Sequence, residues 1–211
     1  MRTWANWMLP AYVLMVPLCA AADSTPAAVI DQLDATLLDV LKNAATLGFK
    51  GRFDKLNPVV GTSFDLPFMA EKSVGQHWKA LSEADRARWL EVFREFMVST
   101  YAANFDHFSN QTFERLGEEP GGNDTTMVKT RVVDPATESV DLTYRLHKAD
   151  GGWKIIDVYL KGTVSELAMR RSDYSSVLER QGVNALIETM KKRIANLAAG
   201  KGKQQVGAPP A

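Results

Sequence analysis

The chain has 211 residues and carries 25 basic against 25 acidic side chains, which gives a formal net charge of zero. A chain of this length can bury a core of its own, most simply as one domain. The lack of a basic surplus argues against nucleic-acid binding, because that function needs cations to neutralise phosphates.

The first 22 residues have the pattern of a secretory signal peptide. Arg2 supplies a positive start, an apolar run extends over Met8–Leu18, and Ala20-Ala21-Ala22 forms a small-residue cleavage site. The apolar run is shorter than the roughly 20 residues that a membrane span needs. We therefore expect export and cleavage after Ala22; the alternatives are an uncleaved anchor or a lipoprotein attached through Cys19.

Cleavage after Ala22 has consequences for the mature chain. Cys19 is the only cysteine, so the mature protein would lack disulfides, a thiolate nucleophile and cysteine metal sites. Residues 23–200 would then form a single domain held together by its core. Residues 201–211 are rich in Gly, Lys, Gln and Pro and are expected to be a disordered tail.

Apolar residues at helical spacing predict three helices in the first part of the mature chain. The expected helices are Ala27–Ala45, Arg52–Val60 and Pro67–Trp78. Gly48 and Gly51 separate the first two, and Pro58 is expected to end the second, because proline cannot donate the hydrogen bond that a helix needs.

Ser82 opens the longest expected helix, from about Glu83 to His107. Ser82 and Asp85 have the spacing of a capping box, which satisfies free backbone N–H groups at a helix start. Bulky apolar side chains recur every three or four residues along this helix and therefore share one face. They are Trp89, Val92, Phe93, Phe96, Met97, Tyr101, Phe105 and Phe108.

After this helix the apolar period drops toward two, which is typical of strands. The expected strands are Thr112–Leu116, Thr126–Val133, Val140–His147 and Trp153–Lys161, and two helices, Ser172–Gln181 and Val183–Ala198, follow them. Gly182 is expected to separate these two helices. The predicted fold class is α+β, with a curved antiparallel sheet of about four strands packed with N-terminal and C-terminal helices.

No group of residues predicts catalysis or metal binding. His77, His107 and His147 lie in different expected elements and lack the spacing of a metal-ligand motif. Glu118 and Glu119 are adjacent carboxylates, but they fall in an expected Pro/Gly loop, where such charges are usually solvated. We therefore predict no catalytic residue, no metal and no cofactor.

The aromatic face of the long helix has two interpretations. Bulky side chains at helical spacing are most often plain core. A second bulky cluster, which includes Phe64, Phe68 and Trp78, precedes this helix. Large side chains that face a curved sheet can also enclose a carbon-lined cavity, which stays dry unless an apolar ligand fills it. Each methylene buried there contributes about 0.8 kcal/mol, so such a cavity can hold a lipid.

Cations close to the end of the last strand suggest a rim for such a cavity. Arg170 and Arg171 precede Tyr174 in the expected helical part, and Lys161 ends the last strand. These cations could contact a lipid headgroup or an acidic surface of a transporter. The alternative is an ordinary solvated helix face.

Three segments resemble the MlaC family of periplasmic lipid carriers, also called Ttg2D. The most specific is Trp153–Ile187, where a strand runs into a helix with the pattern R-S-x-Y-x-x-V-L-x-x-x-G-x-x-x-L-I. Phe93–Ala102 is similar to the family's F-x-x-x-L-x-x-T-Y-A, with Met97 in place of Leu. Phe68–Trp78 matches F-x-x-M-A-x-x-x-x-G-x-x-W only in part, because Phe68 and Met69 are adjacent.

Four further stretches resemble the hopanoid-biosynthesis-associated branch of the family, called HpnM. They are Leu47–Arg52, Phe64–Met69, Leu116–Pro120 and Leu160–Leu167. This resemblance suggests a polycyclic or other lipid as cargo rather than an ordinary diacyl phospholipid.

The family resemblance implies a cone-like sheet of nuclear-transport-factor-2 type and a periplasmic protein that carries one lipid. Its partners would be an inner-membrane Mla/Ttg2-type ABC transporter and an outer-membrane donor or acceptor, and we expect a monomer. The residues expected to line the lipid cavity are Leu66, Phe68, Met69, Trp78, Trp89, Val92, Phe93, Phe96, Met97, Tyr101, Phe105, Tyr144, Val158, Leu160, Val164, Leu167 and Tyr174.

Two other functions stay open. One is a small enzyme on the same type of sheet, for which Asp141 or Asp157 would be the candidate acid. The other is a periplasmic adaptor that binds only protein and has a filled core. Volume separates the three functions, because a carrier needs a large apolar cavity, an enzyme a smaller polar one and an adaptor none.

Overall fold

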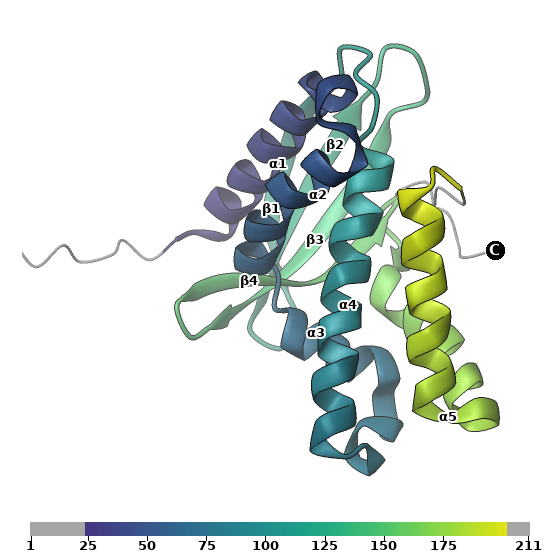
Figure 1. Cartoon of the computed structure of the whole chain (residues 1–211). Helices are drawn as coiled ribbons and strands as arrows, with labels where there is room; N and C mark the ends of the chain where they lie inside the picture. The colour runs from purple at the N-terminus through teal and green to yellow at the C-terminus, as the bar shows by residue number, and fades with distance from the viewer. Residues whose placement is uncertain (1–23, 202–211) are drawn as a thin grey trace, which may run out of the picture.

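The computed structural model describes residues 24–201, so the predicted signal peptide and nearly all of the predicted tail lie outside the described residues. Helices occupy both ends of this range and a sheet lies between them in sequence (Figure 1). The N-terminal elements are α1 (Pro26–Lys42), α2 (Ala44–Ser63), α3 (Leu66–Val74), the 3-10 helix η1 (Gly75–Ala80) and α4 (Glu83–Asn104). The strands are β1 (Thr112–Gly121), β2 (Thr125–Val133), β3 (Val140–Ala149), β4 (Gly152–Leu160) and β5 (Val164–Ser165), and α5 (Glu166–Ala198) follows.

The long helix α4 begins as predicted. The Ser82 hydroxyl oxygen accepts a hydrogen bond from the Asp85 N–H at 3.1 Å, which satisfies one of the free donors of the first turn. The helix ends at Asn104, three residues before the predicted end at His107. Phe105 has non-helical angles, φ −98° and ψ 59°, and is buried, so the chain turns here toward the sheet.

The predicted end of the second helix at Pro58 was wrong. Helix α2 continues through Pro58 to Ser63. Val59 and Val60, directly after the proline, are buried, and this burial outweighs the loss of one backbone hydrogen bond. Gly48 was predicted to separate two helices, but it kinks α2, with φ 59° and ψ −176°, and α2 begins at Ala44 rather than at Arg52.

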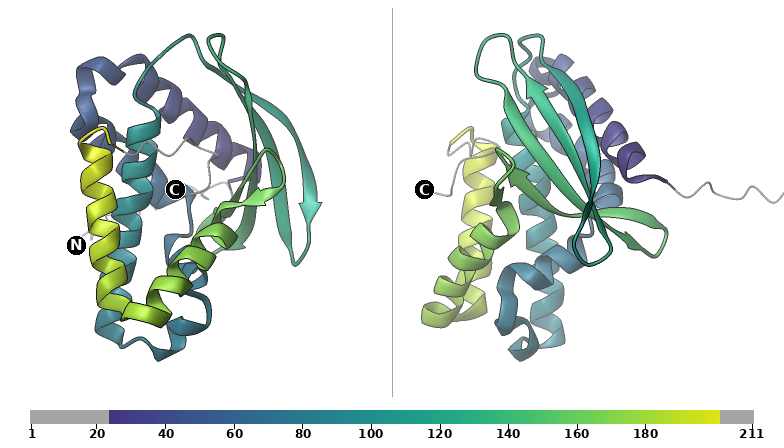
Figure 2. Two further views of the ribbon diagram at one scale, coloured as in Figure 1. Left: turned by 90° about the vertical axis from the view of Figure 1, so that its right-hand side faces the viewer. Right: turned by 180° about the vertical axis from the view of Figure 1, so that it is seen from behind.

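The last helix, α5, starts earlier than predicted, at Glu166 rather than Ser172. Ser165 caps it, because its hydroxyl oxygen accepts a hydrogen bond from the Ala168 N–H at 3.0 Å. Gly182 breaks it as predicted, since its φ of 77° and ψ of 177° lie outside the helical region. The two halves of α5 therefore run in different directions (Figure 2).

The sheet is antiparallel throughout, with the order β1-β2-β3-β4-β5. This confirms the predicted curved antiparallel sheet between helical parts, but with five strands rather than about four, because the two residues of β5 pair with β4. Strand β1 also runs beyond the predicted Leu116 to Gly121, with a register shift between Arg115 and Gly117. Glu118 and Glu119 therefore lie on a paired strand and not in a loop.

The core lies between the concave side of the sheet and the helices, which all cover one face of the sheet (Figure 2). Leu142, Tyr144 and Leu146 alternate along β3 and are buried, as period-two patterning requires. Helix α4 packs between α2 and α5, while α1 contacts β1, β2 and β4. No helix within residues 24–201 is long and apolar enough to cross a membrane.

Candidate functional site

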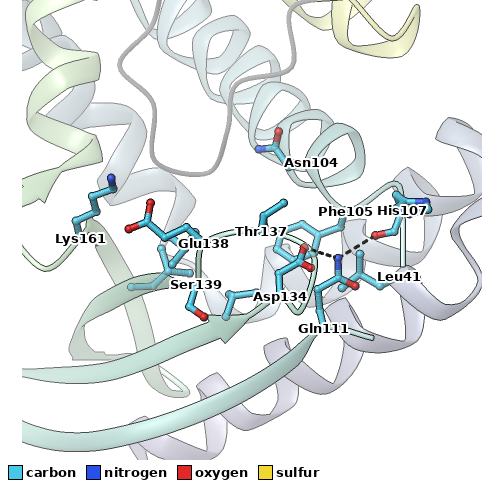
Figure 3. A pocket seen from close by; sticks show the side chains of 13 residues that line it. Leu41, Asn104, Phe105, His107, Gln111, Asp134, Thr137, Glu138, Ser139 and Lys161 are labelled. Atoms are coloured by element: carbon cyan, nitrogen blue, oxygen red, sulfur yellow. Dashed lines mark hydrogen bonds between the residues drawn. The ribbon is translucent and has the colours of Figure 1, made fainter. Parts of the chain in front are cut away.

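A pocket of about 440 Å³ lies at the end of the sheet where α1 and α4 finish (Figure 3). Its lining comes from five parts of the chain: the end of α1, the end of α4 with the segment that follows it, strand β2, the loop into β3 with the start of β3, and the turn after β4. The lining residues are Leu41, Asn104, Phe105, His107, Gln111, Val132, Asp134, Thr137, Glu138, Ser139, Val140, Leu142 and Lys161. The volume is within the range of ligand pockets in proteins, which is roughly 300–1,000 Å³.

The inner wall of the pocket is apolar. Leu41, Phe105 and Leu142 belong to the buried core, and Val132 and Val140 pack against it. The Phe105 ring is stacked between two further rings, with centroid distances of 5.9 Å to Tyr101 and 6.2 Å to Phe113 (residues on α4 and β1). Each Å² of apolar surface that a ligand buries against this wall stabilises binding by about 25 cal/mol.

One side of the pocket is fixed by a hydrogen-bond network around Asp134. Its carboxylate accepts hydrogen bonds from the Ser109 hydroxyl at 2.8 Å, the Gln111 amide at 3.0 Å and the Ala136 N–H at 2.8 Å. The Ala136 N–H contributes most to holding the pKa of Asp134 below its usual value, so this carboxylate stays ionised. The network ties the β2–β3 loop to the segment after α4 and gives the pocket a stable wall.

Arg52 holds the end of α4 that contributes to the pocket. It is buried, and its guanidinium donates hydrogen bonds to the Ala102 carbonyl at 2.8 Å and the Ala44 carbonyl at 3.1 Å. The Ala102 carbonyl lies near the end of α4 and the Ala44 carbonyl at the start of α2. The Arg52 side chain therefore holds these two helix ends together.

Three other polar groups of the pocket have no such partners. The Asn104 amide nitrogen is shielded from water and finds no acceptor among the residues that the structure describes. An unpaired buried donor of this kind costs about 1–3 kcal/mol. Glu138 and Lys161 are exposed and form no ion pair or hydrogen bond through their side chains within residues 24–201. The backbone of Lys161 is fixed, however, because its N–H donates to the Asp141 carbonyl at 2.9 Å.

Most residues that were expected to line a lipid cavity lie in the packed core and not on this pocket. The buried ones are Leu66, Met69, Trp89, Val92, Phe93, Phe96, Met97, Tyr101, Tyr144, Val158, Leu160 and Tyr174, while Phe68, Trp78 and Leu167 are partly buried against them. Only Phe105 of the expected set lines the pocket, and Leu167 lines a second, more open pocket of about 520 Å³. The structure thus brings the expected residues together as a core.

Trp89 shows how tightly this core is packed. Its indole N–H donates to the Ala70 carbonyl at 2.9 Å, and its ring meets Tyr174 edge-on at 5.2 Å and Phe93 at 5.9 Å. Val164 is the exception among the expected residues, since 44% of it is exposed. It lies on the two-residue strand β5 at the edge of the sheet, outside the core.

The expected rim cations Arg170 and Arg171 face different environments. The Arg170 guanidinium lies over the Phe96 ring, 5.0 Å from its centroid, and donates to Glu166 at 2.8 Å. Burial lowers the pKa of Arg170, but Tyr174 and Glu166 outweigh this and raise it overall, so Arg170 is a permanent cation in the interior. It therefore fits neither the expected rim nor a solvated face. Arg171 is exposed and lines the second pocket with Lys72.

The carboxylates that an enzyme would need already have structural partners. Asp157 accepts hydrogen bonds from the Val158 N–H, the Leu167 N–H and the Ser165 hydroxyl, at 2.6–3.1 Å. Burial raises the pKa of Asp157, and these three bonds act against the rise. Asp141 forms a bidentate pair with Arg131 at 2.6 and 3.0 Å, which lowers the pKa of Asp141.

One histidine also has an acidic partner. His147 Nε2 lies 2.8 Å from Asp65, whose other carboxylate oxygen caps α3 by accepting from the Phe68 N–H at 3.0 Å. Neither His147 nor Asp65 lines either pocket described above. No group of three or more His, Cys, Asp or Glu that could hold a metal ion occurs between residues 24 and 201.

The pocket residues escaped prediction because they share no pattern along the sequence. Asp134-Pro135-Ala136-Thr137 reads as a turn between two strands and nothing more. The sequence offered one local signal for the pocket, which is that the polar loop 134–139 connects two alternating strands. The side chains of such a loop lie at the end of a sheet.

Comparison with known proteins supports the family resemblance. The sequence model of the family described as "MlaC protein" matches residues 31–192. The chain is 26% identical over 132 residues to the intermembrane phospholipid transport system binding protein MlaC of Haemophilus influenzae, a match that spans 61% of each protein. The chain thus spans about three fifths of the length of this curated relative.

A solved structure has the same fold. It is the phospholipid-binding protein from Ralstonia solanacearum, determined in complex with a phospholipid. The TM-score is 0.72 at 22% sequence identity, and the match covers 84% of this chain and 99% of that one. At this level of identity the similarity demonstrates the fold and leaves the ligand to be argued from this chain's own residues.

Proposed function

Because the chain belongs to the MlaC family, we propose that it is a periplasmic carrier that binds one lipid molecule and moves it between membranes. The observation that supports this function is the pocket at the end of the sheet, with its apolar inner wall and polar rim. An amphiphile needs this combination, because its chains lose contact with water while its headgroup keeps it.

The relatives favour a phospholipid as the cargo. The Haemophilus protein is described as part of an intermembrane phospholipid transport system, and the Ralstonia protein was solved with a phospholipid. We retain a hopanoid or sterol-like lipid as the alternative cargo, on the resemblance of Leu160–Leu167 and three other stretches to the HpnM branch. The partners in this proposal are an inner-membrane Mla-type ABC transporter and an outer-membrane donor or acceptor, and the carrier is a monomer.

Hydrophobic burial supplies the binding energy for such a carrier. Each methylene that leaves water contributes about 0.8 kcal/mol, so a chain of a dozen or more methylenes binds without any covalent chemistry. A carrier of this kind needs no catalytic group. The N-terminal 22 residues would direct export, and 23–200 would be the lipid-binding domain.

The proposal is tested by isolating the mature chain, from Asp23 onward, out of the periplasm. Native mass spectrometry followed by organic extraction should detect one lipid per protein and identify its class. A protein that arrives without lipid and takes up none from vesicles would contradict a carrier function and favour the adaptor or the enzyme.

A pair of variants tests whether this pocket is the site. Val140→Lys places a cation on the apolar wall at a partly buried position, and Val164→Lys makes the same change at an exposed position away from the pocket. We expect the first to lose most of its lipid and the second to keep it, with both folded by circular dichroism. Equal loading of the two variants would place the lipid elsewhere.

A further inference from the structure

The rim of the pocket carries two opposite charges that are unpaired within residues 24–201. Of its charged side chains, Asp134 is fully engaged by Ser109, Gln111 and Ala136. Glu138 and Lys161 have no ion-pair or hydrogen-bond partner for their side chains in the described part of the chain, although both line the pocket. Figure 3 shows them on the same side of the pocket, across from Asn104. As far as the described residues show, a ligand at this rim meets one unpaired anion and one unpaired cation.

Asn104 adds a neutral donor at a deeper level. Its amide nitrogen is shielded from water and has no acceptor among residues 24–201. The residue ends α4 directly before Phe105, which belongs to the apolar wall. An unpaired donor next to hydrocarbon is stabilised when a ligand supplies an acceptor oxygen.

These pocket residues become more polar as their exposure to solvent increases. Leu41, Phe105 and Leu142 are buried, Asn104 is partly buried, and Glu138 and Lys161 are exposed. A diacyl phospholipid with an amine headgroup has the same order: acyl chains, ester oxygens, then phosphate and ammonium.

From this match we propose that the pocket selects a zwitterionic phospholipid, an inference that rests on the proposed lipid-carrier function. Asn104 donates to an ester oxygen, Lys161 faces the phosphate, and Glu138 faces the ammonium group. An anionic headgroup without an amine leaves Glu138 without a cationic partner. A neutral polycyclic alcohol leaves both rim charges without partners, so it binds through the apolar wall alone.

The experiment is a competition for the delipidated mature protein. Vesicles contain equal amounts of phosphatidylethanolamine, phosphatidylglycerol and diacylglycerol with identical acyl chains, and native mass spectrometry measures the bound fractions. We expect phosphatidylethanolamine to exceed phosphatidylglycerol by about threefold or more, which is the size of effect that exposed charge contacts give. Equal uptake of all three lipids would overturn the headgroup inference and leave the carrier function intact, whereas no uptake at all would overturn both.

Charge-exchange variants give the sharper result. Glu138→Lys should reverse the preference toward phosphatidylglycerol, and Lys161→Glu should reduce uptake of both phospholipids relative to diacylglycerol. The double exchange should restore the preference for phosphatidylethanolamine, because one charge of each sign is again present. Lys79→Glu, an equal charge reversal on η1 outside the pocket lining, is the control and should match the wild type. Identical headgroup ratios in all variants would overturn the inference.

The Asn104→Ala variant measures the contribution of the amide to lipid uptake independently of the two rim charges. We expect it to lower uptake of all three ester lipids by a similar factor and to leave the ratio of phosphatidylethanolamine to phosphatidylglycerol unchanged. Unchanged uptake would remove Asn104 from the site. Circular dichroism and thermal unfolding of each variant show that lost binding does not come from a lost fold.

Discussion

Asp34 is a carboxyl group in a position that disfavours charge. It lies on α1 between the fully buried Leu33 and Leu37, and its Oδ1 is shielded from water without a donor among the described residues. Burial, and then the nearby Asp31, raise the pKa of Asp34 to about 7. The group therefore holds its proton in the folded protein under conditions where the unfolded chain has lost it.

This raised pKa predicts a pH dependence of stability. Between the unfolded-state pKa of 3.8 and the folded-state pKa of about 7, only the folded form binds the proton. The free energy of unfolding should therefore fall as pH rises through this window, by at most about 4 kcal/mol and by less where solvent reaches the group. Urea unfolding of the wild type and of Asp34→Asn at pH 5 and pH 8 measures the effect.

The variant gives the control for this pH effect. Asp34→Asn cannot ionise, so its loss of stability between the two pH values should be smaller than that of the wild type. If the two proteins lose the same free energy of unfolding from pH 5 to pH 8, Asp34 does not carry the raised pKa.

A substitution at Trp89 distinguishes a role in core packing from a role in lipid binding. Trp89→Phe removes the hydrogen bond to the Ala70 carbonyl and part of the contact with Tyr174. We expect a loss of about 1–3 kcal/mol in the free energy of unfolding, measured by urea denaturation. Lipid loading per folded protein should stay unchanged, because Trp89 does not line the pocket. Reduced lipid loading in a stably folded variant would mean that Trp89 is part of the lipid site.

Burial of single residues was predictable, whereas their lining of a lipid cavity stays a prediction. The spacing of Trp89, Phe93 and Phe96 correctly placed them on one inward face, since periodicity reports which side of a helix avoids water. Whether that face of α4 contacts protein or an empty cavity depends on how far the neighbouring elements lie from it. No local sequence pattern encodes this distance. The same limit explains Val164, whose apolar side chain turned out to be exposed.

At the scale of elements, Gly182 sets the direction of the last helix. Its φ of 77° is one that residues with a side chain adopt only under strain. Gly182→Ala should lower the free energy of unfolding by about 1–3 kcal/mol, although a Cβ there would meet no atom within 4 Å. The cause of the loss is thus the backbone angle and not a collision.

Gly122→Ala is the matched control in the same denaturation experiment. A Cβ at Gly122 also meets nothing within 4 Å, but the backbone there has no positive φ. We expect a change within about 0.5 kcal/mol. Equal effects at Gly122 and Gly182 would mean that the kink in α5 carries no strain.

Element boundaries were predictable where a local interaction fixes them. Ser82 and Asp85 are three residues apart, so the start of α4 could be read from the sequence. The extent of β1 could not, because Glu118 and Pro120 become strand residues only through pairing with β2. Likewise, α2 continues past Pro58 because tertiary burial of Val59 and Val60 overrides the local preference.

At the scale of the whole molecule, lipid should stabilise the fold. A ligand that binds only the folded state adds about 2.7 kcal/mol at a concentration a hundredfold above its Kd. For a domain of this size we expect the Tm of the lipid-loaded protein to exceed that of the delipidated protein by about 5–10 °C. Differential scanning calorimetry measures both forms. Val140→Lys should show little shift, and a full shift in that variant would contradict binding at this pocket.

The fold class and family could be inferred from the sequence, whereas the pocket could not. The order of helical and alternating segments determines an α+β arrangement, because each segment must bury its apolar side. The pocket needs Leu41, Asn104, Val140 and Lys161 from four distant places to meet at one end of the sheet. Their meeting is a property of the packed molecule, and it appears only once the curvature of the sheet is known.

The outer edge of β1 has a consequence for how copies of the protein behave together. No strand within residues 24–201 pairs with this edge, and an open edge can template the addition of a strand from another molecule. Here the register shift at Leu116 interrupts the row of backbone groups, Pro120 lacks an N–H, and Glu118 and Glu119 add negative charge. Two such interrupted edges cannot form a continuous ladder with each other, so this edge is a poor seed for fibril growth at high protein concentration.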